Sequence, residues 1–334
     1  MINTKQYDFY GIGNALLDMV YEVEEQTLID LHVTKGTMRL IDEETHEHFI
    51  KVLSNYKPTY ACGGSAANTA ITAQMFGSKT FYSSQLANDT SGRLYYHDMI
   101  TKGVDTNMTE SNRPDGNTGR CIVLVTPDGE RTMSTYLGIT ENLTNAVINE
   151  QAIIKSKMVF LEGYLVSNAQ TCQTAIETKK IAQQYGVKTA LTLSDPNMFR
   201  FFRDNMNKII GDGLDLIFCN EIEALMLAET NDLNIAEEAL KKITKQYVIT
   251  LGPDGAVSFD GNNRIHLPEY PTTIIDSVGA GDTFAGAFLY QIHQGADFTT
   301  ATDFANYAAS KVVAKLGARL DPQESNKVKE RKNK

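Results

Sequence analysis

The sequence predicts an α/β fold, in which helices cover both faces of a mostly parallel central sheet, together with a small antiparallel sheet. Two observations predict this fold class. From about Ser156 onward, short apolar segments alternate with amphipathic segments of helical spacing, which is typical of parallel sheets buried under helices. Before Ser156, strand candidates follow one another without crossover helices, and these predict the separate antiparallel sheet.

Length and composition limit the class of protein. A chain of 334 residues can bury a large core, as one α/β domain or as two smaller ones. The formal net charge of −10 argues against a general nucleic-acid binder, although a local phosphate site is still compatible with it. The N-terminus lacks the apolar core of a signal peptide, and no apolar run approaches membrane-spanning length. The four cysteines are scattered, without a C-x-x-C pair, so a reducing cytoplasm is the expected location.

The first predicted strand, residues 9–13, runs into a glycine turn at residues 11–16. A dinucleotide-binding turn would carry a third glycine and lead into a helix, but Leu16 stands at that position and the next residues continue as a strand. An oxidoreductase that uses such a cofactor is therefore disfavoured. The strands predicted for the small sheet are residues 17–23, 36–42, 118–125 and 131–136.

The second half of the chain supplies most of the predicted parallel sheet. Its strands are predicted at residues 158–161, 189–193, 214–219, 247–251 and 256–259, and its helices at 169–185, from 221, from 282, and at 301–316. Residues 327–334 are interpreted as a solvated tail. Ligands of such sheets bind at the carboxyl ends of the strands. The residues that fall just after a predicted strand are Asn14, Gly163, Asp195, Asn220, Gly252 and Gly279.

The most informative stretch is Val278-Gly279-Ala280-Gly281-Asp282, which leads into small and apolar residues at helical spacing. The β-branched residues 272–275 before it predict a strand end, so the stretch is interpreted as strand, glycine turn and helix. Glycines let the backbone approach a ligand, and a helix N-terminus offers free N–H groups. A carboxylate there would repel an anion unless it takes a proton from an attacking hydroxyl. We predict an anion hole with Asp282 as base; the alternative is a helix-capping Asp after a glycine turn.

Two further patterns each allow a structural and a functional interpretation. Gly63-Gly64 leads into a helix of small residues with Asn68 one turn in, which fits either tight packing or a ligand-binding turn. Asn220 and Glu223 fit a helix capping box, or a polar pair that organises water around Mg²⁺. No G-x-x-x-x-G-K-[ST] phosphate loop is present in the sequence.

In this order, the glycine pair with Asn68, the N-x-x-E of residues 220–223 and the D-x-x-G-A-G-D of residues 276–282 resemble the ribokinase-like (PfkB) carbohydrate kinases. The resemblance extends from about Tyr7 to Arg319. Residues 11–18, 126–133 and 161–165 are most similar to the adenosine kinase-like branch of that family. The family implies a ribokinase-like α/β core with a small β lid.

The resemblance implies a role for each matching residue. Asp282 would be the base, and Gly279, Ala280 and Gly281 would form the anion hole. The residues that would hold the substrate are Asn14, Asp18, Gly63, Gly64, Asn68 and Tyr164, with Arg131 approaching the phosphates from the lid. The residues that would serve ATP are Asn220, Glu223, Thr250, Gly252, Gly255 and Asn306, with Glu223 contacting Mg²⁺ through water. Asp276 hints at a monovalent cation.

The family also implies a domain division. The core would comprise residues 1–17, 44–113 and 139–334, and the discontinuous lid residues 18–43 and 114–138. The lid would close over the substrate and exclude water. Family members pair their lids between subunits or stand alone, so a monomer and a lid-paired homodimer are both compatible with the sequence.

We therefore predict an ATP- and Mg²⁺-dependent kinase that phosphorylates the primary 5′-hydroxyl of a nucleoside, adenosine first, by in-line transfer. Eukaryotic adenosine kinases usually carry Asn directly before G-A-G-D, where Val278 stands here. The alternative is a kinase of the same family for a free sugar such as ribose or fructose. A catalytically silent sensor of the same fold is disfavoured by the intact Asp282 and its glycine turn.

Overall fold

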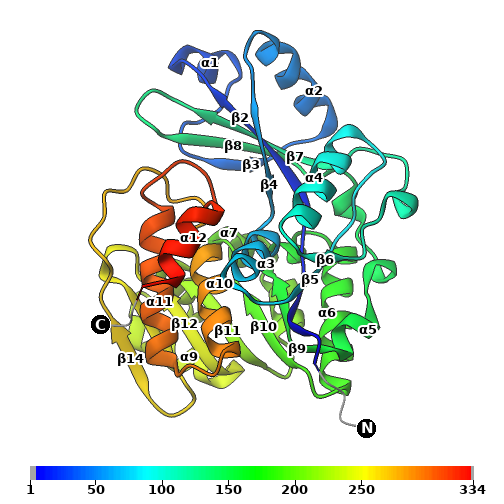
Figure 1. Ribbon diagram of the computed structural model, residues 1–334. Helices are drawn as coiled ribbons and strands as arrows, with labels where there is room; N and C mark the ends of the chain where they lie inside the picture. The colour runs from blue at the N-terminus through cyan, green and yellow to red at the C-terminus, as the bar shows by residue number, and fades with distance from the viewer. Residues whose placement is uncertain (1–4, 332–334) are drawn as a thin grey trace.

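The computed structural model describes residues 5–331 of the chain. Parts of the N-terminus considered for a signal peptide and of the predicted tail at 327–334 lie outside the described residues. A nine-stranded sheet forms the larger part of the molecule (Figure 1). Its strands, in their order across the sheet, are β14 (Arg264–Leu267), β13 (Ala256–Phe259), β12 (Thr244–Thr250), β11 (Leu214–Asn220), β10 (Lys188–Thr192), β9 (Ser156–Glu162), β1 (Tyr7–Ile12), β5 (Thr80–Ser83) and β6 (Asp105–Thr106). All pairs from β12 to β6 are parallel, and β13 and β14 join by antiparallel pairing.

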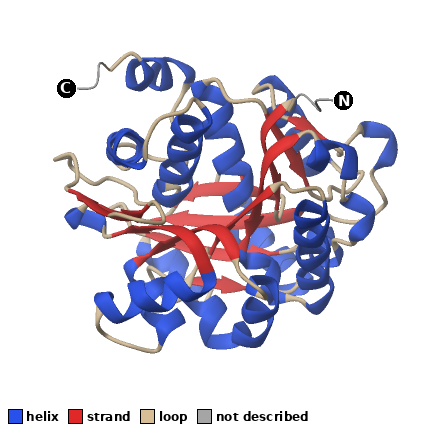
Figure 2. Cartoon of the chain, turned by 90° about the horizontal axis from the view of Figure 1, so that it is seen from below, coloured by secondary structure: helices blue, strands red, loops and turns tan. Residues whose placement is uncertain are grey.

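Helices cover both faces of this sheet, as Figure 2 shows from below. Those on one face are α3 (Ser65–Phe76), α4 (Thr90–Thr101), α10 (Ala280–His293), α11 (Phe298–Val312) and α12 (Pro322–Lys329). Those on the other are α5 (Glu150–Ile154), α6 (Ala169–Gln184), α7 (Pro196–Ile210), α8 (Glu221–Ala228) and α9 (Leu233–Ile243). Neighbouring strand residues such as Phe160 and Leu161 enter opposite cores. The predicted mostly parallel sheet between two helical layers is confirmed.

A second sheet, here called the lid sheet, lies across the carboxyl ends of the parallel strands (Figure 1). Its strands, in order, are β3 (Met38–Leu40), β8 (Arg131–Tyr136), β7 (Gly119–Val125), β2 (Leu16–Glu22) and β4 (Thr59–Gly63). Two helices, α1 (Glu25–Asp30) and α2 (Glu43–Val52), accompany the lid sheet in the chain, and their Leu28 and Phe49 share one apolar cluster with strand residues such as Tyr21 and Ile122.

The prediction that the small sheet is antiparallel is wrong in part. β2 pairs with β7, and β3 with β8, in parallel, whereas β7–β8 and β2–β4 are antiparallel. The reason is connectivity: only β7 and β8 are joined by a tight turn, while the chain passes through the core between β2 and β7 and can re-enter in either direction. β4 also belongs to this sheet, although its residues fall within the segment 44–113 predicted for the core.

Four local predictions near the C-terminus also need correction. Residues 272–275 form no strand, because Ile274 and Ile275 are exposed and Ile275 N–H bonds only to Val313 O. The helix predicted from residue 282 begins at Ala280, and that predicted at 301–316 spans Phe298–Val312 after its cap Asp297. Residues 322–329 form α12, where Val328 is buried, so the predicted tail is helical in that part. Within residues 5–331, no helix has the length and apolar character needed to cross a membrane.

Candidate active site

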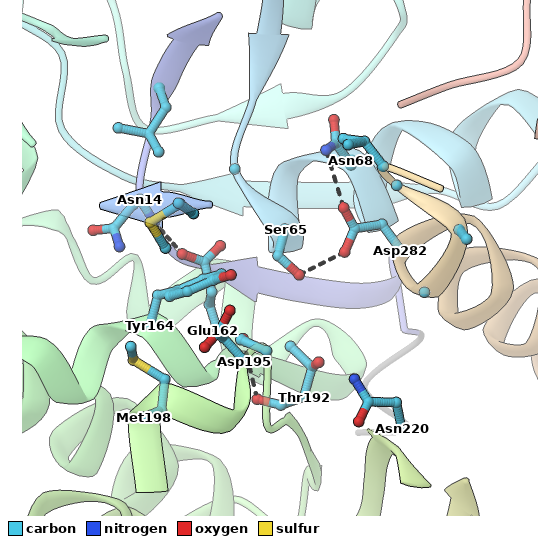
Figure 3. Close-up of a pocket in the computed structure, with 18 of the residues that line it drawn as sticks. Asn14, Ser65, Asn68, Glu162, Tyr164, Thr192, Asp195, Met198, Asn220 and Asp282 are labelled. Atoms are coloured by element: carbon cyan, nitrogen blue, oxygen red, sulfur yellow. Dashed lines mark hydrogen bonds between the residues drawn. The ribbon is translucent and has the colours of Figure 1, made fainter. Parts of the chain in front are cut away.

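A cavity of about 530 Å³ lies between the carboxyl ends of the parallel strands and the lid sheet. Figure 3 shows the side chains that face it from several strand ends and from the N-termini of helices. The predicted site residues that line it are Asn14, Asp18, Gly64, Asn68, Tyr164, Asn220, Glu223, Thr250, Gly252, Gly279, Ala280, Gly281 and Asp282. The structure therefore brings together residues from almost the full length of the sequence at one edge of the sheet, as parallel α/β topology requires.

Asp282 lies in the first turn of α10 and accepts two side-chain hydrogen bonds. Ser65 Oγ donates to Oδ1 at 2.6 Å and Asn68 Nδ2 donates to Oδ2 at 3.0 Å, both from the first turn of α3 (Figure 3). Burial raises the pKa of Asp282 to about 6, and the two hydrogen bonds lower it only in part. A carboxylate with this pKa is ionised at neutral pH and can still accept a proton.

The glycine turn before Asp282 has the geometry of an anion-binding helix start. Gly279 caps α10 with a φ of +74°, and a Cβ there would lie 2.2 Å from Ala318 O, so only glycine fits. Ala280 N–H donates to Ser277 O at 3.2 Å. The helix itself provides no acceptor for the N–H groups of Gly281 and Asp282, because they belong to its first turn. These groups and the positive end of the helix dipole favour an anion.

Asp276 stabilises this turn through hydrogen bonds with the backbone. Its Oδ1 accepts from Val278 N–H at 3.1 Å, and its Oδ2 accepts from Gly317 N–H at 2.7 Å. The same Oδ2 lies 2.6 Å from Nη2 of Arg131, which is the first residue of lid strand β8. Arg131, predicted to approach the phosphates, therefore reaches the loop before the anion hole, and it is not among the residues that line the cavity.

On the other side of the cavity lie Asn14 and Asp18, at the start of the lid sheet. Asn14 Oδ1 accepts from Thr140 Oγ1 at 3.1 Å. Burial raises the pKa of Asp18 to about 7, against the opposing effect of Arg319 and Arg131. Gly63 does not line the cavity, but a Cβ on it would lie 2.6 Å from Asp18 Oδ1, so its absence of a side chain makes room for Asp18.

Asn68 offers a free acceptor beside Asp282. Its Oδ1 is buried and has no hydrogen-bond partner among the residues that the structure describes, while its Nδ2 is held by Asp282. A buried acceptor of this kind costs free energy unless a ligand hydroxyl satisfies it. The pair Asn68 and Asp282 is therefore suited to a substrate alcohol.

Asn220 and Glu223 form the predicted capping box of α8 and also line the cavity. Glu223 N–H donates to Asn220 Oδ1 at 2.8 Å, and Asn220 N–H donates to Glu223 Oε2 at 3.0 Å. Burial raises the pKa of Glu223 to about 7, with Asp195 and Asp282 adding to the rise. The capping and the functional interpretation are thus compatible, because the cap holds the carboxyl in place at the cavity wall.

These residues fit Mg²⁺ that arrives with a nucleotide. No cluster of three or more His, Cys, Asp or Glu side chains suited to a metal ion occurs in residues 5–331. Oxygen donors, however, line the cavity near Glu223, and Mg²⁺ keeps several waters and phosphate ligands. The acidic residues Asp18, Glu162, Glu223 and Asp282 all face this cavity, so a polyphosphate needs a cation to enter it.

Two predicted nucleotide residues, Gly255 and Asn306, lie outside the cavity lining and meet at one segment. A Cβ on Gly255 would lie 2.1 Å from Leu267 O, and Asn306 Nδ2 donates to Pro268 O at 3.2 Å. Both residues thus fix the start of the loop between β14 and α10. Tyr164 is half-buried in the cavity wall, and burial raises its pKa well above the ordinary value.

Sequence reasoning missed several polar residues that line the cavity, and Ser65 and Glu162 are the two whose side chains form hydrogen bonds with other site residues named above. Ser65 follows the predicted glycine pair directly, and that position was the available signal. Glu162 ends β9, at the same sheet edge as Asn14 and Asp195. Its buried carboxylate accepts from Asn14 N–H at 3.0 Å and from Ala66 N–H at 2.8 Å, and burial raises its pKa to about 7. The rule that ligands bind at the carboxyl ends of strands, which selected Gly163, could also have selected the carboxylate of Glu162.

The part of the cavity under the lid sheet is mainly apolar. The apolar residues that line it there are Leu16, Met38, Leu40, Met133 and Leu137, and the lid sheet also contributes Asp18, Cys121 and Thr135. Val278 joins the lining from the loop before the anion hole. A ligand that fills the cavity would therefore have a polar part near Asn68 and Asp282 and an apolar part toward the lid.

Comparison with known proteins places the chain in a described family. Residues 37–325 match the family described as pfkB family carbohydrate kinase. The adenosine kinase of Dictyostelium discoideum is 28% identical over 334 residues, covering 93% of this chain and 96% of that protein. The ribokinase of Staphylococcus aureus (strain COL) is 29% identical over 265 residues, covering 77% of this chain and 83% of that protein.

Solved structures agree in fold over nearly the whole chain. The adenosine kinase from Sinorhizobium meliloti superposes with a TM-score of 0.87 at 31% identity and covers 96% of this chain and 99% of its own. A probable sugar kinase from Rhizobium etli CFN 42 also gives 0.87 at 31% identity, covering 97% and 98%. The ribokinase-like fold is thus confirmed, and relatives of both substrate classes are equally similar.

Proposed function

The chain belongs to the pfkB family of carbohydrate kinases, and from that premise we propose that it transfers the γ-phosphoryl group of ATP to the 5′-hydroxyl of a nucleoside, adenosine first. It is a phosphotransferase that acts on a hydroxyl group, as its relatives are. The observation that carries the choice of a nucleoside is the apolar half of the cavity under the lid sheet. A nucleobase would bury its faces there, whereas a free sugar would leave this apolar surface unfilled.

The proposed mechanism uses residues of this chain for positioning, proton transfer and charge stabilisation. Asp282 accepts the proton of the attacking hydroxyl, and Ser65 and Asn68 hold its two oxygens in place. The N–H groups at the start of α10 stabilise negative charge on the phosphoryl oxygens. Asn220 and Glu223 would hold Mg²⁺ through water, and the ion would neutralise charge between the phosphates. The lid sheet excludes water, which would otherwise compete as acceptor.

One alternative has support of its own. A free-sugar kinase is supported by the similarity to a ribokinase and to a probable sugar kinase. It is also supported by Val278, whose side chain lines the cavity and cannot form a hydrogen bond with a nucleobase. Such an enzyme would use the same base, anion hole and Mg²⁺ site. The two functions differ only in what fills the apolar half of the cavity.

The test is ADP release from MgATP in a coupled assay with adenosine, inosine, guanosine, ribose and fructose. The proposal predicts turnover on adenosine well above that on either sugar. Turnover on a sugar alone would contradict the nucleoside assignment and favour the alternative. The Asp282→Asn protein, assayed in parallel, corrects for contaminating kinases and for ATP hydrolysis in the preparation.

A further inference from the structure

The chain crosses between the core and the lid sheet four times, and the first two crossings touch each other. The first crossing is Gly13–Ala15, between β1 and β2, and the second runs from Gly63 at the end of β4 through Gly64 to Ala66 in the first turn of α3. A Cβ on Gly64, whose φ is +99°, would lie 2.1 Å from Asn14 O. A movement of the lid sheet relative to the core would therefore bend the chain next to this contact.

Glu162, Tyr82 and Tyr95 are three of the buried core side chains that hold the two crossings. Ser84, which donates to Gly13 O at 2.7 Å, is another. Glu162 joins the two crossings, because one oxygen accepts from Asn14 N–H and the other from Ala66 N–H. Tyr82 on β5 donates to Asn14 O at 2.9 Å, and Tyr95 on α4 donates to Gly63 O at 3.0 Å. The side chains of Glu162 and the two tyrosines are almost completely buried, and neither tyrosine lines the cavity.

The two hydroxyls serve no purpose in packing. A phenylalanine would fill the same space, whereas a buried phenol must lose its water and is favourable only when its hydroxyl is bonded. In this structure each hydroxyl is satisfied by a backbone carbonyl of a crossing. Asn14, whose side chain faces the cavity, is fixed at its N–H by Glu162 and at its carbonyl by Tyr82.

The same contacts extend to the catalytic base. Ala66 lies between Ser65 and Asn68, the two residues that donate to Asp282. By holding Ala66 N–H, Glu162 sets where the first turn of α3 begins, and that turn holds Asp282. Substrate-facing Asn14 and the base are therefore tied to one buried carboxylate.

We propose that Glu162, Tyr82 and Tyr95 form a clamp on the two crossings, and that both tyrosines are positioning residues for phosphoryl transfer. The clamp fixes the spacing between Asn14 on one side of the cavity and Asp282 on the other. Its catalytic part rests on the proposed function, because that function supplies the acceptor that Asn14 and Asp282 would align.

The experiment compares Tyr82→Phe and Tyr95→Phe with the control Tyr10→Phe. Tyr10 is equally buried and also loses a bonded hydroxyl, which donates to Ser83 Oγ at 2.6 Å, but that hydroxyl contacts neither crossing. The first readout is hydrogen exchange of the backbone amides of Asn14 and Ala66. The clamp predicts roughly tenfold faster exchange at both crossings in the two test variants, the effect of one lost buried hydrogen bond, and no change in the control.

The second readout is kinetic. Both test variants are expected to lose roughly tenfold in kcat/KM for the acceptor that the wild-type enzyme phosphorylates, with the KM for MgATP and the Tm close to those of the control. Exchange that rises equally in Tyr10→Phe would overturn the clamp, since a general loss of stability then explains it. Faster exchange at the crossings with unchanged transfer would overturn the positioning role.

Failure of the proposed function gives a different result. If the wild-type enzyme phosphorylates a sugar and no nucleoside, the nucleoside assignment fails, while the clamp is still decided by exchange and by kinetics on that sugar. If it phosphorylates none of the five acceptors, exchange at Asn14 and Ala66 alone decides the clamp.

Discussion

At the scale of single residues, Asp282 balances two opposing effects. Burial favours its neutral form, while the hydrogen bonds from Ser65 and Asn68 favour the carboxylate, and the result is a pKa of about 6. Asp282→Asn keeps the size of the side chain and removes the proton acceptor. We expect turnover to fall roughly 10²- to 10⁴-fold, the usual contribution of a general base, with an unchanged Tm.

The matched control is Asp297→Asn. Asp297 also lies at the start of a helix, where it caps α11 by accepting from Thr300 N–H at 2.8 Å. Asn caps helices about as well as Asp, so activity and stability should both be retained. Full activity of Asp282→Asn in the same assay would show that the base has been assigned to the wrong residue.

The raised pKa of Asp282 also predicts the pH profile. The base works only when ionised, so kcat/KM should decline as the pH falls through about 6. Glu223, whose pKa is about 7, faces the same cavity, and its protonation would steepen the decline. The apparent pKa values of the profile therefore belong to the acidic residues of the cavity together and not to Asp282 alone. A profile of kcat/KM from pH 5 to 8.5 tests this. A rate that rises toward pH 5 would contradict a carboxylate base.

At the scale of elements, the turn from β4 into α3 depends on one glycine. Gly64 has a φ of +99°, and a Cβ there would overlap Asn14 O. Gly64→Ala therefore combines backbone strain with a clash against a carbonyl that cannot move freely. We expect a loss of about 2–4 kcal/mol in the free energy of unfolding, together with most of the activity.

Gly186→Ala separates the two contributions. Gly186 has a φ of +65° at the end of α6, but a Cβ there would have nothing within 4 Å. Strain alone should cost about 1–2 kcal/mol and leave the kinetics unchanged. Denaturant unfolding of both variants measures the difference, and equal losses at the two positions would rule out the clash at Gly64.

Sequence periodicity predicted the longer strands of both sheets and missed strands that are short or exposed. Strands such as β9 and β11 are buried on both faces and flanked by amphipathic helices, so their apolar runs stand out. β4 is a lid edge strand with three exposed residues, and β5 is short, so neither has a clear pattern. The direction of β7 relative to β2 depends on the path of the chain between them, which no local pattern encodes.

At the scale of the whole molecule, the sequence could predict that Asp282 and several strand-end residues lie at one site, because each carries a local signal. It could not predict contacts made by folding distant segments together. Glu162 accepts hydrogen bonds from Asn14 and Ala66, which lie 148 and 96 positions before it in the sequence. Arg131 of the lid sheet forms an ion pair with Asp276. These contacts depend on the path of the whole chain, so no local pattern in the sequence indicates them.

The ion pair between Arg131 and Asp276 is more buried than the other ion pair that the described residues form between lid sheet and core, that of Arg120 with Asp89. The paired atoms of Arg131 and Asp276 are 2.6 Å apart, with the side chains only 10% and 2% exposed, so solvent screens the pair weakly. Arg131→Gln should free the lid sheet, while Asp276 keeps its hydrogen bonds from Val278 and Gly317. We expect amide exchange in β7 and β8 to rise roughly tenfold or more, the scale of a charged hydrogen bond, and the acceptor KM to rise with it.

Lys35→Gln is the control, because Lys35 is a lid cation whose partners Glu25 and Asp128 belong to the same part of the chain. Its pairs are more exposed and do not reach the core, so its loss should leave exchange in β7 and β8 and the acceptor KM unchanged. If both variants raise amide exchange and the acceptor KM equally, the loss of positive charge in the lid sheet explains the effect, and the ion pair of Arg131 with Asp276 does not. If Arg131→Gln loses turnover without faster exchange, Arg131 acts on the phosphates directly, as the family resemblance implies, and the ion pair does not hold the lid in place.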